Sequence, residues 1–112
     1  MSISQFIKGF NLLQKDVHRN AIARGWWETD RPDGELLALI HSEVSEALEA
    51  MRRGNPQSPD CPDFSCAEVE LADVIIRIMD FAEARGWNVA KALAQKHEFN
   101  QGRSYRHGGK LF

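Results

Sequence analysis

Four acidic residues form two pairs with helical spacing in the middle of the chain. Glu43 and Glu46 are three residues apart, and so are Glu70 and Asp73. Positions i and i+3 of an α-helix project from the same face, so each pair presents two neighbouring carboxylates. Carboxylate oxygens are hard ligands that suit Mg²⁺ or Mn²⁺. If the two pairs face each other, the pattern predicts a divalent-cation site with four oxygen-donating side chains.

Glu43 lies on the apolar side of its expected helix. Because each helical residue advances about 100° around the axis, Glu43 falls inside the arc delimited by Leu39 and Leu48. A carboxylate at this position is expected to be partly buried, and burial of an unpaired charge costs several kcal/mol. The position of Glu43 therefore favours a site over a solvated surface.

Glu70 and Asp73 lie on the single polar strip of the next expected helix, which they share with Arg77 and Asp80. An alternative interpretation is a solvated face with an Asp73–Arg77 ion pair at i,i+4. A di-iron centre is disfavoured because that site requires Glu-x-x-His on two helices. None of the nine glutamates has a histidine three residues later.

The apolar pattern predicts four helices that position these acids. The first contains the apolar residues of positions 6–21 and stops at Gly25. The second begins at Asp33, a predicted N-cap, and ends near Gly54. Residues 65–68 form a capping box that opens a third helix to about Arg85, and Asn88 caps a fourth over 89–101. Short connections then predict one domain, 1–112, with an all-α, antiparallel four-helix bundle.

The third helix is apolar around most of its circumference, so three neighbouring helices of one small chain cannot readily cover it. We therefore expect a homodimer or a homotetramer, since a second copy would cover the remaining apolar stripe.

Composition excludes several classes of protein. The chain has 112 residues, 43% hydrophobic, with a net charge of −2, which excludes intrinsic disorder. No apolar run is long enough to span a membrane and no secretory signal is evident, so we expect a cytoplasmic protein without a membrane partner. Its two cysteines are expected to be reduced thiols.

Charge is distributed unevenly along the chain. Residues 1–32 carry a net charge of +2, residues 33–83 carry −9, and residues 84–112 carry +5. This asymmetry suits a ligand that combines a metal cation with phosphate, although it is also compatible with an unspecialised solvated surface. A nucleic-acid partner is disfavoured, because the basic residues form no stripe along one helix and the pI is near 6.1.

These motifs together resemble the MazG-like family of all-α nucleoside triphosphate pyrophosphatases. The segment HSEVSEALEAMRRG and the downstream segment EVELADVIIRIMD resemble the family's Glu-x-x-Glu and Glu-x-x-Asp motifs, which Glu43, Glu46, Glu70 and Asp73 match. The tail KHEFNQGRSYRHGGK resembles the phosphate-binding segment, with Lys96, Asn100, Arg103, Tyr105 and Arg106 at matching places. The stretch VHRNAIARGWW resembles the first helix and turn, where His18, Trp26 and Trp27 would border the base.

The resemblance implies Mg²⁺-dependent hydrolysis of a (d)NTP to the monophosphate and pyrophosphate, in a nucleotide-pool housecleaning role. The four acids would then be catalytic and hold Mg²⁺, with Mn²⁺ as a possible substitute. Phosphoryl-transfer chemistry depends mainly on positioning and charge stabilisation. The two acidic pairs and the basic C-terminal segment agree with this requirement. The rival interpretation is a non-catalytic helical module that binds a nucleotide or a partner protein with a degenerate site.

Two points stay open at the level of sequence. Some family members carry a glutamate directly before the first motif residue, where this chain has Ser42. Serine is not a base at neutral pH, so Glu46 or Glu49 could position the water, and the general base is unassigned. Trp26 and Trp27 could stack on the nucleobase, or they could make core or dimer contacts. His18 could reach the base pocket, or it could be a capped surface residue.

Overall fold

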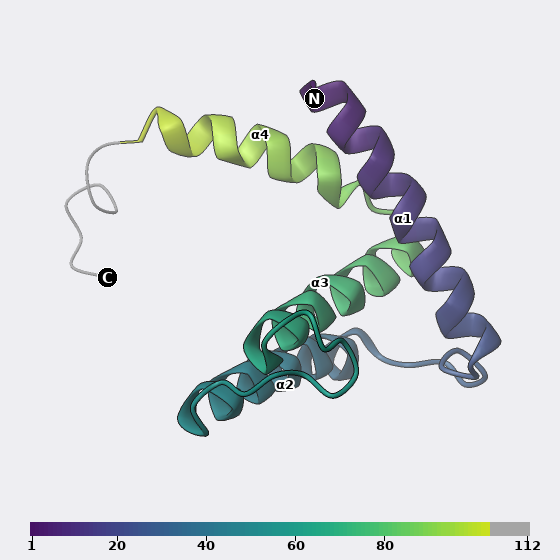
Figure 1. Cartoon of the computed structure of the whole chain (residues 1–112). Coiled ribbons are helices and arrows are strands. Elements are labelled where there is room, and N and C mark those ends of the chain that lie inside the picture. Colours follow the sequence, from purple (N-terminus) through teal and green to yellow (C-terminus); the bar gives the residue numbers. More distant parts are fainter. Residues whose placement is uncertain (104–112) are drawn as a thin grey trace.

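The local signals in the sequence produce four α-helices, as Figure 1 shows. The computed structural model describes residues 1–103, and no strand occurs within this range. The helices are α1 (Ile3–Ala23), α2 (Asp33–Arg52), α3 (Cys66–Arg85) and α4 (Val89–Gln101). The prediction of an all-α protein is therefore confirmed for the described part of the chain.

The ends of α3 are fixed by the predicted capping residues. Ser65 Oγ accepts a hydrogen bond from the backbone N–H of Glu68 at 3.2 Å, and the Glu68 carboxylate accepts one from the backbone N–H of Ser65 at 3.0 Å. These reciprocal bonds satisfy donors that the first helical turn leaves free. Gly86 ends the helix in the left-handed conformation, with φ 71°. This helix carries Glu70 and Asp73, so its defined start fixes their orientation.

The prediction of Asp33 as an N-cap is wrong by one residue. Pro32 occupies the N-cap position, with extended backbone angles and no side-chain cap bond, and Asp33 is the first residue of α2. An acidic side chain in the first turn interacts favourably with the positive end of the helix dipole. The Asp33 carboxylate instead pairs with Arg85 of α3, with a nitrogen–oxygen distance of 2.6 Å.

α3 is the central helix of the fold. It packs most extensively against α2, which runs antiparallel to it, and it also packs against α1, while α4 packs mainly against α1 (Figure 1). Cross-helix contacts show the opposed direction of α2 and α3, because Asn55 meets Ala67 near one end and Asp33 meets Arg85 at the other. The α2–α3 pair therefore places the acidic motifs of the two helices beside each other.

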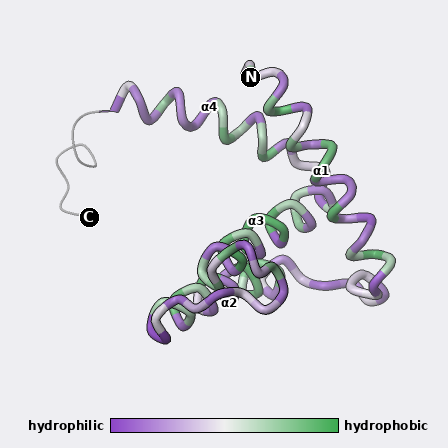
Figure 2. Tube along the Cα trace, viewed as in Figure 1, coloured by the Kyte–Doolittle hydropathy of each residue, from purple (hydrophilic) through white to green (hydrophobic). Residues whose placement is uncertain are grey.

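Large apolar side chains of α3 remain exposed in the single chain, although Met79, Phe81 and Ala82 are buried. Leu71, Ile75 and Ile76 are 53%, 49% and 43% exposed. Figure 2 shows hydrophobic segments along α3. The radius of gyration is 16.4 Å, compared with about 13 Å for a compact domain of roughly this length. One chain thus leaves much of its apolar surface uncovered, as the sequence pattern of α3 predicts.

Candidate metal centre

Three of the four predicted acids converge between α2 and α3. Glu43 of α2 and Glu70 and Asp73 of α3 each offer a carboxylate oxygen, and these oxygens lie within 4.8 Å of one another. All three residues are partly buried. Two ligand oxygens on opposite sides of a Mg²⁺ ion lie about 4.2 Å apart, because each metal–oxygen distance is about 2.1 Å. Small side-chain rotations would therefore suffice for shared coordination, and the donor set fits a hard divalent cation.

Glu46 lies one helical turn beyond Glu43 and is exposed, so it is not part of the three-residue cluster. Its charge nevertheless adds to the burial and the nearer charges that raise the pKa of Glu70. Ser42 uses its hydroxyl to donate to the backbone carbonyl of Leu39 at 2.6 Å. Glu46 is thus available as an outer ligand or for positioning a water, and Ser42 is engaged with its own helix.

The cluster has a positive partner in Arg77. Its Nε donates to Glu43 Oε1 at 2.7 Å, and the side chains of Arg77 and Glu43 are 28% and 14% exposed. The expected partial burial of Glu43 is confirmed, and its charge is paired across the helix interface. Because Arg77 reaches Glu43 on α2, the alternative of an Asp73–Arg77 ion pair on a solvated face does not describe this arrangement.

Burial and neighbouring negative charges raise the pKa of two acids of the cluster. For Glu70 the main cause is burial, followed by the charges of Asp73, Glu43 and Glu46 and a hydrogen bond with Glu43. For Asp73 burial again dominates, the charge of Glu43 adds to it, and Arg77 acts in the opposite direction. Burial and like charges both disfavour the ionised form of a carboxyl group. The site is therefore electrostatically suited to a cation of charge greater than one.

A cleft of about 450 Å³ opens beside the cluster, a size suited to a small-molecule ligand. Glu43, Asp73, Arg77 and Asp80 line it, and apolar side chains of α1 form another wall together with the indole of Trp26. Trp26 is 41% exposed, and the guanidinium carbons of Arg31 and Arg77 lie 5.0 and 5.1 Å from its ring centroid. The cleft thus joins an acidic end to a planar aromatic surface.

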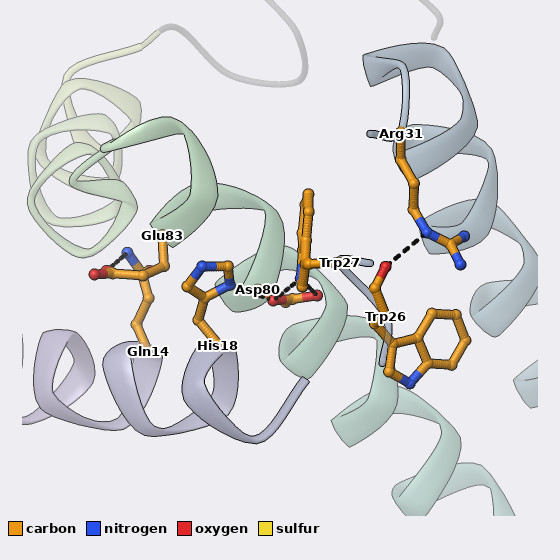
Figure 3. A network of polar contacts seen from close by, with 7 residues as sticks. All are labelled: Gln14, His18, Trp26, Trp27, Arg31, Asp80 and Glu83. Carbon is orange, nitrogen blue, oxygen red and sulfur yellow. Dashed lines mark hydrogen bonds and ion pairs between the residues drawn. The ribbon is translucent and has the colours of Figure 1, made fainter. Parts of the chain in front are cut away.

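The two other residues predicted at the base site bind Asp80 instead of forming the cleft wall. His18 Nδ1 lies 2.7 Å from Asp80 Oδ1, and Trp27 Nε1 donates to both carboxylate oxygens at 2.9 and 3.1 Å (Figure 3). The rings of His18 and Trp27 also meet edge-on, with centroids 5.4 Å apart. These contacts fix the carboxylate of Asp80, which itself lines the cleft. Of the three predicted base contacts, Trp26 is therefore the one whose side chain faces the cleft.

The predicted phosphate-binding residues are separate from the acids within one chain. Lys96 and Asn100 are exposed on α4 and Arg103 follows that helix, with Lys96 Nζ 4.5 Å and Arg103 Cζ 5.9 Å from the ring centroid of Phe99. α4 packs mainly against α1 and diverges from the acidic part of α3 (Figure 1). Tyr105 and Arg106 lie outside the described residues.

Arg77 and Asp80 are the cleft residues whose partners the sequence did not reveal. Both lie on the polar strip of α3, one and two turns after Asp73, where helical spacing already indicates a shared face. Their partners come from α2, α1 and the turn after α1, and no local pattern encodes these contacts.

Comparison with protein-family models, curated proteins and solved structures gave no match to this chain. None of the helices in residues 1–103 is both long enough and apolar enough to cross a membrane. The function of the chain is therefore inferred from the residues and geometry of the site.

The raised pKa of Glu70 predicts a pH-dependent stability. Its folded-state pKa exceeds its ordinary value of 4.5, so the folded chain binds this proton more tightly than the unfolded chain does. The free energy of unfolding then falls as pH rises from about 4.5 through the raised pKa. In metal-free buffer, Glu70→Gln should raise Tm at pH 7, and its advantage over the wild type should shrink as the pH falls to 4.5. Thermal melts with EDTA between pH 4.5 and 7.5 measure this.

The matched control is Glu49→Gln, which removes an exposed carboxylate from α2. It should leave Tm nearly unchanged across the same pH range. An equal Tm difference for Glu70→Gln at every pH would contradict the electrostatic origin of the effect.

Proposed function

We propose that the protein is a Mg²⁺-dependent nucleoside triphosphate pyrophosphatase, which hydrolyses a (d)NTP to the (d)NMP and pyrophosphate. The observation that carries this proposal is the convergence of Glu43, Glu70 and Asp73 beside a cleft that Glu43 and Asp73 line together with the exposed indole of Trp26. The acids suit a metal–triphosphate group, and the indole of Trp26 suits a planar base. The resemblance of the motifs to the MazG-like family supports the same reaction, with a housecleaning role in the cytoplasm.

The acidic residues supply the metal ligands in this proposal. Glu43, Glu70 and Asp73 would hold the cation, and Glu46, one turn from Glu43, would be an outer ligand or would position a water. A bound Mg²⁺ neutralises phosphate charge and stabilises the developing charge on the transferring oxygens. Ser42 cannot act as the base, so a carboxylate of α2, Glu46 or Glu49, is the candidate for positioning the attacking water.

The aromatic wall of the cleft supplies the base contact. Arg31 holds the backbone of Trp26, because its Nε donates to the Trp26 backbone carbonyl at 2.9 Å (Figure 3). Stacking of a base on an indole contributes about 1–3 kcal/mol and is tolerant of base identity. His18 and Trp27 contribute through Asp80, whose carboxylate they orient at the cleft wall.

The phosphate-binding residues of α4 require a second copy of the chain in this proposal. Arg85 lies twelve positions after Asp73 on α3, a helical distance of about 18 Å, and α4 starts beyond that end. α4 packs mainly against α1, away from the acids. In a homodimer or homotetramer, Lys96, Asn100 and Arg103 of one copy can lie beside the acids of another, and the exposed apolar face of α3 is covered.

The reaction itself predicts where solvent oxygen enters the products. Water attack at the α-phosphorus places the label from ¹⁸O-water in the nucleoside monophosphate, and mass spectrometry of the products measures it. In a panel of (d)NTPs tested with Mg²⁺, at least one should yield a nucleoside monophosphate that carries the ¹⁸O label. Label in free orthophosphate alone would indicate a γ-phosphatase, and nucleotide binding without turnover across the panel would support the non-catalytic module.

Each acid of the two motifs should be required for turnover. Replacement of Glu43, Glu46 or Glu70 by Gln, or of Asp73 by Asn, keeps side-chain size and removes a charged ligand oxygen. The expected loss of activity is about 10²-fold or more for each variant, because a metal-stabilised transition state loses charge compensation. Steady-state rates of pyrophosphate release measure the effect.

Asp63→Asn is the control for these variants, since Asp63 is an exposed carboxylate of the loop between α2 and α3 and does not line the cleft. It should retain near-normal rates. Near-normal rates in two of the four motif variants would contradict the metal-binding role of the acids.

Assembly should depend on the exposed face of α3. Ile75→Glu places a charge at a residue that is 49% exposed in the single chain. If a second copy covers this residue, the variant should dissociate toward smaller species and lose activity in parallel, because a buried unpaired charge is destabilising. Light scattering at micromolar concentration measures the mass, and Ser4→Glu in the first turn of α1, at an exposed position, is the control. A fully active wild-type monomer would contradict this assembly.

A further inference from the structure

Arg77 occupies an unusual position between the acids and the cleft. Its Nε donates to Glu43 Oε1 at 2.7 Å, while its guanidinium carbon lies 5.1 Å from the centroid of the Trp26 ring. The side chain lines the cleft and is 28% exposed. One guanidinium group therefore contacts a candidate metal ligand and the aromatic wall of the candidate nucleotide pocket.

The charges around Arg77 make it the counter-ion of the cluster. Glu43, Glu70 and Asp73 carry three formal negative charges when ionised, and Arg77 is the cation within 4.0 Å of them among the described residues. The nearby carboxylate of Asp80 accepts hydrogen bonds from Trp27 and is in contact with His18. Arg77 thus supplies one of the positive charges that the cluster needs, and a divalent cation would supply two.

We infer that Arg77 is a phosphate-binding residue, held on Glu43 in the metal-free protein and released toward the substrate's phosphates when a divalent cation binds the acids. This inference rests on the proposed metal site. A cation held by Glu43 would repel the Arg77 guanidinium and would compete with it for the carboxylate. The cation–π contact with Trp26 keeps the displaced guanidinium at the cleft wall. Guanidinium groups bind phosphate oxygens through paired, charge-assisted hydrogen bonds, so the released group has a partner in a bound triphosphate.

A purely structural ion pair makes different predictions. In that case Arg77 stays on Glu43 when metal binds, and its removal loosens the α2–α3 contact and weakens metal binding. An exchanging Arg77 competes with the metal, so its removal strengthens metal binding and weakens phosphate binding. These opposite directions separate the two roles.

The first experiment observes the exchange directly in the full-length wild-type chain. In protein labelled with ¹⁵N-arginine, the Nε–Hε signal of Arg77 is assigned by its loss in Arg77→Gln. Titration with Mg²⁺ should shift this signal and increase its solvent exchange. The Nε–Hε signal of Arg85 should stay in place, since Arg85 joins the same two helices through Asp33, far from the cluster. An Arg77 signal unmoved at saturating Mg²⁺ overturns the inference.

The second experiment measures binding by calorimetry, with Mn²⁺ alone and then with tripolyphosphate at saturating Mg²⁺. Arg77→Gln should bind Mn²⁺ about fivefold more tightly, as expected for loss of a competing, partly exposed ion pair. It should bind tripolyphosphate about tenfold more weakly, as expected for loss of a charge-assisted contact. Arg77→Lys should restore part of the phosphate affinity, and Arg85→Gln should match the wild type in both titrations.

The outcomes distinguish this inference from the function on which it rests. If the wild type binds no Mn²⁺, the metal site and the inference both fail. If the wild type binds Mn²⁺ but Arg77→Gln binds it equally or more weakly, with an unchanged circular dichroism spectrum, the inference alone fails. Tighter Mn²⁺ binding together with weaker tripolyphosphate binding supports it.

Discussion

The repulsion between carboxylates at the α2–α3 interface is the constraint on which the site depends. Three acids share a region in which their ligand oxygens lie within 4.8 Å of one another. At an effective dielectric constant of about 20, two unit charges at that distance repel each other by on the order of 3 kcal/mol before screening by salt. A fold of modest stability tolerates this only where other contacts hold the helices together. Here the contacts are the apolar packing of α3 against α2 and ion pairs at two levels, Arg77–Glu43 and Arg85–Asp33.

In the proposed function, Arg77 and a divalent cation are two alternative sources of the positive charge that reduces this repulsion. The arginine neutralises one charge and leaves Glu70 and Asp73 with raised pKa values, so its compensation is incomplete. A divalent cation provides twice the charge at a shorter distance, and its binding free energy increases with the unrelieved repulsion. In the proposed function, relief of this repulsion would contribute to the binding free energy of the metal.

The helices could be predicted from the sequence because their ends are locally encoded. Ser65 and Glu68 cap α3, Gly86 ends it in a conformation that suits glycine, and Asn88 accepts from Lys91 N–H to start α4. Helical spacing also predicted that Glu70 and Asp73 share a face and that Glu43 is partly buried. The partners of Arg77 and Asp80 could not be predicted, because they depend on how α1, α2 and α3 cross. Helical spacing allows Arg77 to pair with Asp73, four residues earlier, but Arg77 pairs with Glu43 of α2. Only the tertiary arrangement determines which of the two acids is its partner.

The separation of charge along the chain becomes a spatial separation in the fold. The acids lie in the middle of the α2–α3 pair, whereas Lys96 and Asn100 lie on α4, which packs mainly against α1. A triphosphate with its metal needs both kinds of residue within a few ångströms, because charge stabilisation falls off with distance and is screened by water. The uncovered apolar face of α3 requires burial for an independent reason, the hydrophobic effect. In the proposed function, one contact with a second copy of the chain would meet both requirements, so that the assembly and the completed site would form together.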